Sequence, residues 1–343
     1  MRNKKLYVII GLFAIGTVWY GMGCSVKPVQ KSSIVDLKNG DSYTLTAAYI
    51  VKQVSGKEQR MLAYNKYIPG PTIRVPQGAE ITLNLKNDTD MPTLLHSHGI
   101  RMANAFDGSQ LQQEEIKPGE SFSYKLKFND AGVYWYHPHA NEVYGQGLGL
   151  YGAFIVTPAD PEYFPPVNRE VPLFLADIPV ENGKITLSNN SPSHSLMGHY
   201  GNVMVVNGEE NYAIEARQGE VIRLYLINAA NTRPFNFVIR DAQLKLIGGD
   251  SGAYERAAFV QNIVLAPSER VIVDVFLPRA GKYELLNQTP DKTYPLGEII
   301  ASGSPPDVSY EAAFRILQTS QETSQSIAPF RGLMGKEPDK RIV

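Results

Sequence analysis

The sequence has 343 residues, of which 43% are hydrophobic and 20% are charged, and its formal net charge is -1. This length is enough for two domains that each bury a core, and the composition is typical of a globular protein. Because the charges balance and no basic block occurs, nothing favours binding of nucleic acid. The single cysteine, Cys24, excludes an internal disulfide and a cysteine-based zinc cage.

The first 24 residues have the pattern of an export signal. Basic residues, among them Lys4 and Lys5, precede an apolar run from Leu6 to Met22, and Cys24 follows. The run is shorter than the roughly 20 residues that a membrane span needs. Two kinds of membrane anchor remain open, a lipid on Cys24, as in a bacterial lipoprotein, and an uncleaved helix. Both interpretations place the body of the protein outside the cytoplasm, in the periplasm or cell envelope.

From Ile34 onward, apolar and polar residues alternate, which is typical of half-buried strands. The alternation is clear over residues 80–86 and 121–128. Turn signals such as "IPGPT", "KPGE" and "DAGVY" separate the runs. This pattern predicts an all-β protein built from antiparallel sandwiches.

An internal repeat predicts two copies of one β-sandwich. One set of residues recurs at unchanged spacing: Ile73, Gln77, Gly78, Ile81, Leu83, Leu85 and Asn87 correspond to Ile214, Gln218, Gly219, Ile222, Leu224, Leu226 and Asn228. A second set recurs likewise: Pro118, Glu120, Ala131, Gly132 and Tyr134 correspond to Pro267, Glu269, Ala280, Gly281 and Tyr283. We expect domains at residues 34–157 and 169–303, a proline-rich linker at 158–168 and a polar tail at 304–343.

Two His-x-His pairs, in "HSHG" and "YHPH", hold four of the six histidines: His96, His98, His137 and His139. Residues two apart on a strand share a face, so two neighbouring strands can bring four imidazoles together. Imidazole suits zinc, copper, iron and nickel, and the ligand type alone does not choose among them. The alternative interpretation is that these are ordinary core or surface histidines.

The repeat discriminates between these interpretations. At the corresponding spacings the second copy has no histidine: it has Phe237, Ile239, Leu286 and Gln288. The strand pattern is present in both copies, so the fold does not require the histidines. We therefore predict a metal site in the first copy.

The motifs around these pairs resemble a known family. "IPGPTIRV", "HSHG", "AGVYWYHPH" and "GLYGAFIV" are similar to the first cupredoxin domain of multicopper oxidases. "VMVVNGE", "IRLYLINAAN" and "IVLAPSERVIVDV" are similar to the copper-free middle domain of three-domain members, such as bacterial laccases and cuprous oxidases. The resemblance covers roughly Ile34 to Gln288 and implies two tandem cupredoxin-like Greek-key β-sandwiches. Ser97 departs from the tryptophan that is more common at its position.

The resemblance also implies roles. His96 corresponds to a ligand of the type 2 copper of a trinuclear cluster, and His98, His137 and His139 correspond to ligands of the type 3 pair. Asp107 stands where the family has an acidic residue that assists proton delivery; the alternative is an Asp-Gly turn. The implied reaction couples oxidation of phenolic substrates or metal ions to the four-electron reduction of O2 to water.

The sequence contains half of the eight trinuclear ligands. A type 1 site also needs a cysteine thiolate and two histidines, which in the family come from a last domain with a His-Cys-His motif. We interpret the chain as the N-terminal portion of a multicopper oxidase, inactive without a C-terminal cupredoxin domain, which could be a separate polypeptide. The alternative is a non-enzymatic exported copper-binding or scaffold protein. A two-domain nitrite reductase or small laccase is disfavoured because both need a cysteine motif.

Two further motifs contain residues that could serve a function. "SHSLMGHYG" contains the soft-metal donors His194, Met197 and His199, but its serine- and glycine-rich surroundings favour a loop. "GDSGA" at residues 249–253 has the look of a nucleophile loop, yet it lacks a base and an orienting carboxylate. We predict no function for either.

Overall fold

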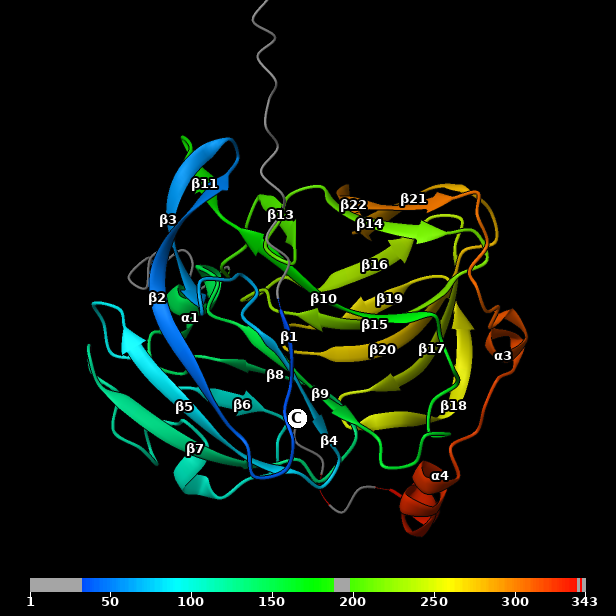
Figure 1. The fold of residues 1–343 in the computed structure, drawn as a ribbon, viewed down its shortest axis with the longest axis horizontal. Coiled ribbons are helices and arrows are strands. Elements are labelled where there is room, and N and C mark those ends of the chain that lie inside the picture. Colours follow the sequence, from blue (N-terminus) through cyan, green and yellow to red (C-terminus); the bar gives the residue numbers. More distant parts are fainter. Residues whose placement is uncertain (1–32, 188–197, 338–339, 341–343) are drawn as a thin grey trace, which may run out of the picture. The chain divides into compact units, whose positions relative to one another are not determined.

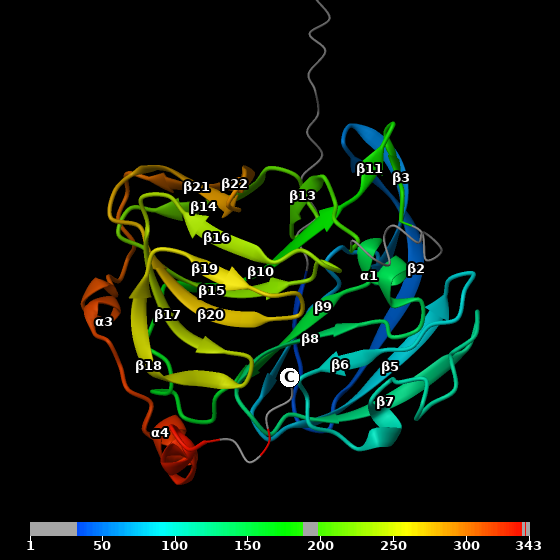
Figure 2. The same ribbon diagram turned by 180° about the vertical axis from the view of Figure 1, so that it is seen from behind.

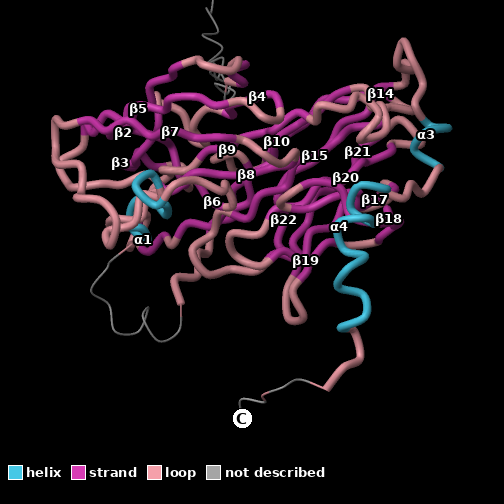
Figure 3. The backbone as a smooth tube through the Cα atoms, turned by 90° about the horizontal axis from the view of Figure 1, so that it is seen from below, coloured by secondary structure: helices cyan, strands magenta, loops and turns pink. Residues whose placement is uncertain are grey.

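The computed structural model describes residues 33–187, 198–337 and 340, which lie in one compact unit, Ser32–Val343. The predicted export segment with Cys24 lies outside the described residues. Within the part described, no helix is long and apolar enough to cross a membrane. Strands dominate the fold (Figures 1 and 2), and Figure 3 shows that the helices are short. The prediction of an all-β protein with two tandem sandwiches is confirmed.

The first sandwich has a five-stranded sheet, ordered β1-β4-β9-β8-β6, and a four-stranded sheet, ordered β3-β2-β5-β7. In chain order the strands are β1 (Ile34–Asp36), β2 (Ser42–Val54), β3 (Lys57–Tyr64), β4 (Thr72–Pro76), β5 (Glu80–Asp88), β6 (His96–His98), β7 (Ser121–Lys127), β8 (Gly132–His137) and β9 (Gly152–Thr157). The predicted alternation builds the core: Ile81, Leu83 and Leu85 of β5 are buried, whereas the residues between them are more exposed.

The second sandwich has a six-stranded sheet, ordered β13-β10-β15-β20-β17-β18, and a five-stranded sheet, ordered β14-β22-β21-β16-β19. The strands are β10 (Arg169–Ile178), β13 (Val203–Val206), β14 (Tyr212–Arg217), β15 (Val221–Asn228), β16 (Phe235–Ile239), β17 (Gln243–Gly249), β18 (Gly252–Val260), β19 (Ile263–Leu265), β20 (Arg270–Phe276), β21 (Gly281–Gln288) and β22 (Thr293–Ser302), with a small ribbon of β11 (Val180–Glu181) and β12 (Lys184–Ile185). The order β4-β9-β8-β6 of the first sandwich recurs as β14-β22-β21-β16.

The repeated residues include several that form the turns and strand ends. Gly78 and Gly219 both have left-handed backbone conformations, with φ of +84° and +82°. Asn87 and Asn228 are both fully buried at the end of a strand, and each side-chain amide donates to two backbone carbonyls. The repeat therefore reflects turn and strand-end chemistry that a sandwich of this type uses twice.

The two sandwiches share an apolar interface along β8. Val133 and Trp135 of β8 pack in one cluster with residues of the second sandwich, including Phe174 and Ile272. Tyr134 and Tyr136, which alternate with them, pack into the core of the first sandwich. Every residue of β8 is therefore buried, which explains why its sequence is apolar without alternation.

The described residues also form five helical segments: η1 (Asn104–Phe106), α1 (Glu142–Gly147), α3 (Glu311–Arg315), α4 (Gln321–Ile327) and η2 (Ala328–Leu333). The last three lie in the region expected to be a polar tail. That region packs on the second sandwich: Phe314 is buried against Val221 and Phe276, and Lys245 donates to the carbonyl of Ala313. The polar composition of this region did not predict the contact, because a single buried aromatic residue, Phe314, makes most of it.

Asn228→Ala should destabilise the protein, because it removes the partners of three buried backbone groups. Asn228 donates to the carbonyls of Arg233 and Leu265 and accepts from the backbone N–H of Ala230. We expect a loss of about 2–4 kcal/mol in the free energy of unfolding, measured by urea denaturation. The control is Asn84→Ala, on an exposed strand face, with an expected change within about 0.5 kcal/mol. Equal losses in the two variants would contradict this role.

Candidate metal centre

Two adjacent strands and the turn after them hold the four predicted histidines. β6 and β8 pair antiparallel, with His96 opposite His137 and His98 opposite Trp135. His96 and His98 lie two residues apart, so both side chains lie on one face of the sheet. His139 follows β8 by two residues. The register of one strand pair thus brings both His-x-His motifs together.

The four imidazole rings form one group. The ring centroids of His96 lie 5.4 Å from those of His98 and His137, and 4.2 Å from that of His139, which is stacked on it. One potential ligand atom from each of His96, His137 and His139 lies within 4.8 Å of the others. His98 lies beside this triad, 5.7 Å from His137 between centroids.

Backbone carbonyls orient two of the rings. The Nδ1 atom of His96 lies 2.8 Å from the carbonyl oxygen of Asp107, and that of His137 lies 3.1 Å from the carbonyl oxygen of Pro138. A carbonyl can only accept, so each Nδ1 carries the proton and each Nε2 keeps its lone pair. The buried Nε2 of His137 has no hydrogen-bond partner among the described residues. Such an atom is costly unless something binds it, and a metal ion would.

All four histidines are held in the neutral form. Burial, with the charge of Arg270 as the next cause, lowers the pKa of His98 to about 4. Burial also lowers the pKa values of His96, His137 and His139, most strongly that of His137. Neutral imidazole is the form that binds metal, so the site is ready for a cation at neutral pH.

Asp107 lies beside the histidines, as predicted. Its Oδ1 atom is 3.5 Å from Nδ1 of His96. It also ends η1 and precedes Gly108, which has a φ of +73° and lies against the backbone of Leu95. The functional and the turn interpretations are thus both compatible with its position, because the turn brings the carboxylate to His96.

Three residues around the site were not predicted from the sequence. Oε1 of Glu142, at the start of α1, lies 3.7 Å from Nδ1 of His137. Trp135 is fully buried, and its ring stacks on His137 with centroids 4.2 Å apart. Arg270 reaches the site from the second sandwich. The proximity of Glu142 and Trp135 to "YHPH" was a signal for them; Arg270 had none.

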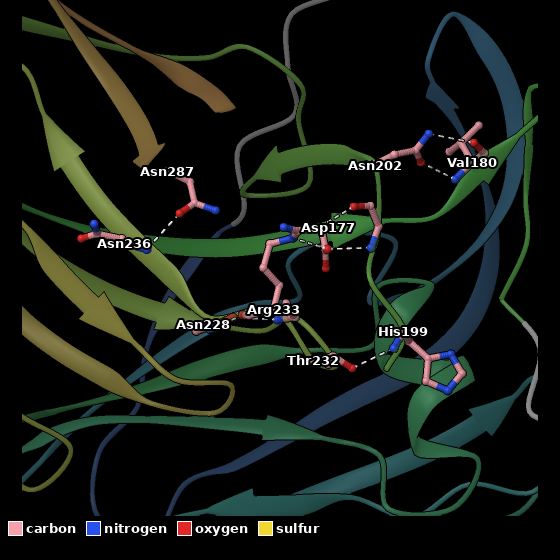
Figure 4. Close-up of polar contacts among 11 residues, drawn as sticks. Asp177, Val180, His199, Asn202, Asn228, Thr232, Arg233, Asn236 and Asn287 are labelled. Carbon is pink, nitrogen blue, oxygen red and sulfur yellow. Dashed lines mark hydrogen bonds and ion pairs between the residues drawn. The ribbon is translucent and has the colours of Figure 1, made fainter. Parts of the chain in front are cut away.

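The corresponding place in the second sandwich is filled differently. Phe237 and Ile239 of β16 lie in the hydrophobic core. The strand register puts Asn287 opposite Phe237, one residue later than the counting from Tyr283 predicts. Oδ1 of Asn287 accepts from the backbone N–H of Asn236 (Figure 4).

Residues of the two minor motifs make the following contacts where the structure describes them. His194 and Met197 lie outside the described residues. The backbone N–H of His199 donates to the hydroxyl of Thr232 (Figure 4). In "GDSGA", Oδ1 of Asp250 accepts from the backbone N–H of Arg270.

A protein with this fold and a four-histidine centre between adjacent strands belongs with the copper-binding cupredoxin proteins. The profile "Multicopper oxidase" matches residues 46–161, and a second profile of that description matches residues 177–298. The chain belongs to the multicopper oxidase family, and copper is therefore the implied metal.

The chain is similar to several known proteins. It is 30% identical to the multicopper oxidase mco of Staphylococcus haemolyticus, over 71% of this chain and 56% of that protein. The crystal structure of a multi-copper oxidase from Pseudomonas Thermotolerans superposes with a TM-score of 0.71 at 29% identity, over 80% of this chain and 66% of the other. The laccase-like multi-copper oxidase CueO from Ochrobactrum sp. gives 0.73 at 25% identity, over 82% and 65%. The chain spans about half the length of the curated relatives it matches.

The depressed histidine pKa values predict a pH-dependent stability for the metal-free protein. An unfolded histidine binds its proton near pH 6.5, about its ordinary pKa, whereas folded His98 binds it only near pH 4. Between these values the unfolded state binds more protons, so the free energy of unfolding falls as the pH is lowered. We expect His98→Asn to reduce this pH slope in urea denaturation with chelator present. An unchanged slope in the variant would show that His98 titrates normally.

Proposed function

We propose that this chain is the copper-binding N-terminal portion of a multicopper oxidase, which couples oxidation of phenolic substrates or metal ions to the four-electron reduction of O2 to water. The observation that carries the proposal is the group of four neutral imidazoles on β6, β8 and the following turn, with the buried Nε2 atom of His137 unpaired in the described structure. The potential ligands are imidazole nitrogens, and imidazole is a suitable ligand for copper.

Within this proposal the four histidines bind a trinuclear cluster. His96 would hold the type 2 copper, and His98, His137 and His139 would hold the type 3 pair. Bound copper supplies one-electron redox chemistry, which oxygen reduction requires. The carbonyls of Asp107 and Pro138 fix the rings of His96 and His137 before any metal arrives. This reduces the conformational cost of binding.

The carboxylates of Asp107 and Glu142 would have different roles at the site. Asp107 is partly exposed and faces His96, so its carboxylate can accept a proton from solvent and bring it to the site. Glu142 adds a second negative charge beside His137, which favours binding of a cation. On this proposal, a further cupredoxin domain provides the remaining trinuclear ligands and the type 1 site, whether on the same polypeptide or on another. Export to the periplasm or cell envelope remains part of the proposal.

Copper binding can be followed through Trp135, because its ring stacks on His137. In a Trp19→Phe background, Trp135 is the only tryptophan, and Cu(II) should quench its fluorescence. We expect His137→Ala to weaken Cu(II) binding at least about tenfold. The matched control is His199→Ala, on a different loop, which should leave the affinity unchanged. Loss of affinity in both variants, or in neither, would contradict the proposed site.

The Cu(II)-loaded chain should lack the intense blue absorption of a type 1 site. That absorption needs a cysteine thiolate with two histidines, and Cys24 is the only cysteine of the sequence. The loaded chain should also turn over neither diphenols nor Cu(I) in air on its own. An intense blue colour, or oxidase activity that survives repurification, would contradict the proposal that the chain lacks a type 1 site.

A further inference from the structure

A buried arginine of the second sandwich contacts the first sandwich next to the proposed copper site. Arg270 opens β20, and its side chain is only 2% exposed. Its Nε atom donates to the carbonyl of Val133 on β8, at 3.4 Å, and its Nη1 atom donates to the carbonyl of Ser268, at 2.7 Å. The nearest acid is Asp250, whose Oδ1 is 3.4 Å from Nε and whose side chain is half exposed.

The guanidinium lies against the residue that follows His98. A Cβ atom on Gly99 would lie 2.6 Å from Nη2 of Arg270, so a larger residue there would displace the guanidinium. Gly99 also has a φ of +86°, which glycine adopts without strain. The carbonyl of Val133 accepts a hydrogen bond from Arg270. Val133 lies on β8 two residues before Trp135, which is opposite His98 in the sheet. Arg270 therefore contacts β8 and the residue that follows β6.

The repeat shows that the sandwich fold does not require this arginine. Glu269 corresponds to Glu120, and each carboxylate accepts from a backbone N–H three residues earlier in the same turn. The next residue is Arg270 in the second sandwich but Ser121 in the first. Both copies have the turn, but only the second has the arginine. The turn therefore does not explain why an arginine stands at this position.

The charges around the histidines are unevenly distributed. Carboxylates lie near Nδ1 of His96 and of His137, namely those of Asp107 and Glu142. His98 has the opposite surroundings, because the guanidinium of Arg270 lies against Gly99, the residue that follows His98. One side of the site is thus negative and the other positive.

We propose that Arg270 is a positioning residue which holds the His98 side of the copper site and, through its fixed charge, favours Cu(I) over Cu(II) there. This rests on the proposed function. A fixed positive charge repels a divalent ion about twice as strongly as a monovalent one. Because the guanidinium is buried, solvent and salt screen it weakly. The second sandwich, which binds no copper of its own in this proposal, thereby adjusts the site in the first.

The test compares the affinities of the metal-free full chain for the two ions. Cu(I) is titrated anaerobically against bathocuproine disulfonate, and Cu(II) is titrated against glycine. We expect Arg270→Gln to lower the ratio of Cu(I) to Cu(II) affinity about tenfold, equivalent to about 59 mV for a one-electron couple. Arg270→Lys, which keeps the charge, should stay close to the wild-type ratio.

A second variant acts in the opposite direction. Asp250→Asn keeps the oxygen that accepts from the backbone N–H of Arg270 but removes the charge that offsets the guanidinium. This variant should raise the ratio of Cu(I) to Cu(II) affinity. Because Asp250 is half exposed, the substitution should not disturb folding. The variant therefore tests the role of Arg270 even if Arg270→Gln does not fold. A purely structural role for Arg270 predicts no such opposite shift.

The outcomes separate the two proposals. A wild-type chain that binds neither ion overturns the proposed function. A wild-type chain that binds copper, with a ratio unmoved by Asp250→Asn or by Arg270→Gln, overturns the role of Arg270. A ratio that shifts as far in Arg270→Lys as in Arg270→Gln does so too, since the effect would then come from the shape of the side chain.

Discussion

The burial of β8 on both faces is the constraint on which the rest of the structure depends. One set of its side chains, Tyr134 and Tyr136, fills the first sandwich, and the other set, Val133 and Trp135, joins the second sandwich. A strand packed on both sides has little freedom to shift or twist. Its last residue is His137, so the packing of two domains fixes the position of a single imidazole.

The same constraint explains why the site lies where it does. β6 is short and lies at the edge of its sheet, next to β8. Pairing with a rigid neighbour gives it a defined register, which a three-residue edge strand would otherwise lack. His96 and His98 therefore take their positions from β8. The turn after β8 then returns His139 to stack on His96.

Local patterns carried most of the predictable information. Alternation and turn residues such as Gly78 and Gly219 depend on a few neighbouring residues, so they predicted both sandwiches. The His-x-His spacing predicted that the imidazoles share a face, and the grouping around His96 agrees with it. Arg270 was not predictable, because its contact with Val133 exists only after two domains pack. The register of Asn287 was missed for a related reason, since a count along one strand does not determine which residue of the neighbouring strand lies opposite.

The comparison of the two sandwiches separates what the fold needs from what the site needs. Asn87 and Asn228 make equivalent bonds, and Tyr134 and Tyr283 each donate to a carbonyl four residues earlier. These contacts recur because every such sandwich must satisfy buried backbone groups at its turns. The histidines do not recur: Phe237 occupies the core where His96 faces other imidazoles. Asn287 lies opposite Phe237, as His137 lies opposite His96, and its side-chain oxygen accepts a hydrogen bond. The buried Nε2 of His137 has no such partner among the described residues, which makes it costly in a core. The presence of this unpaired imidazole nitrogen in one copy supports the proposal that the site binds a metal ion.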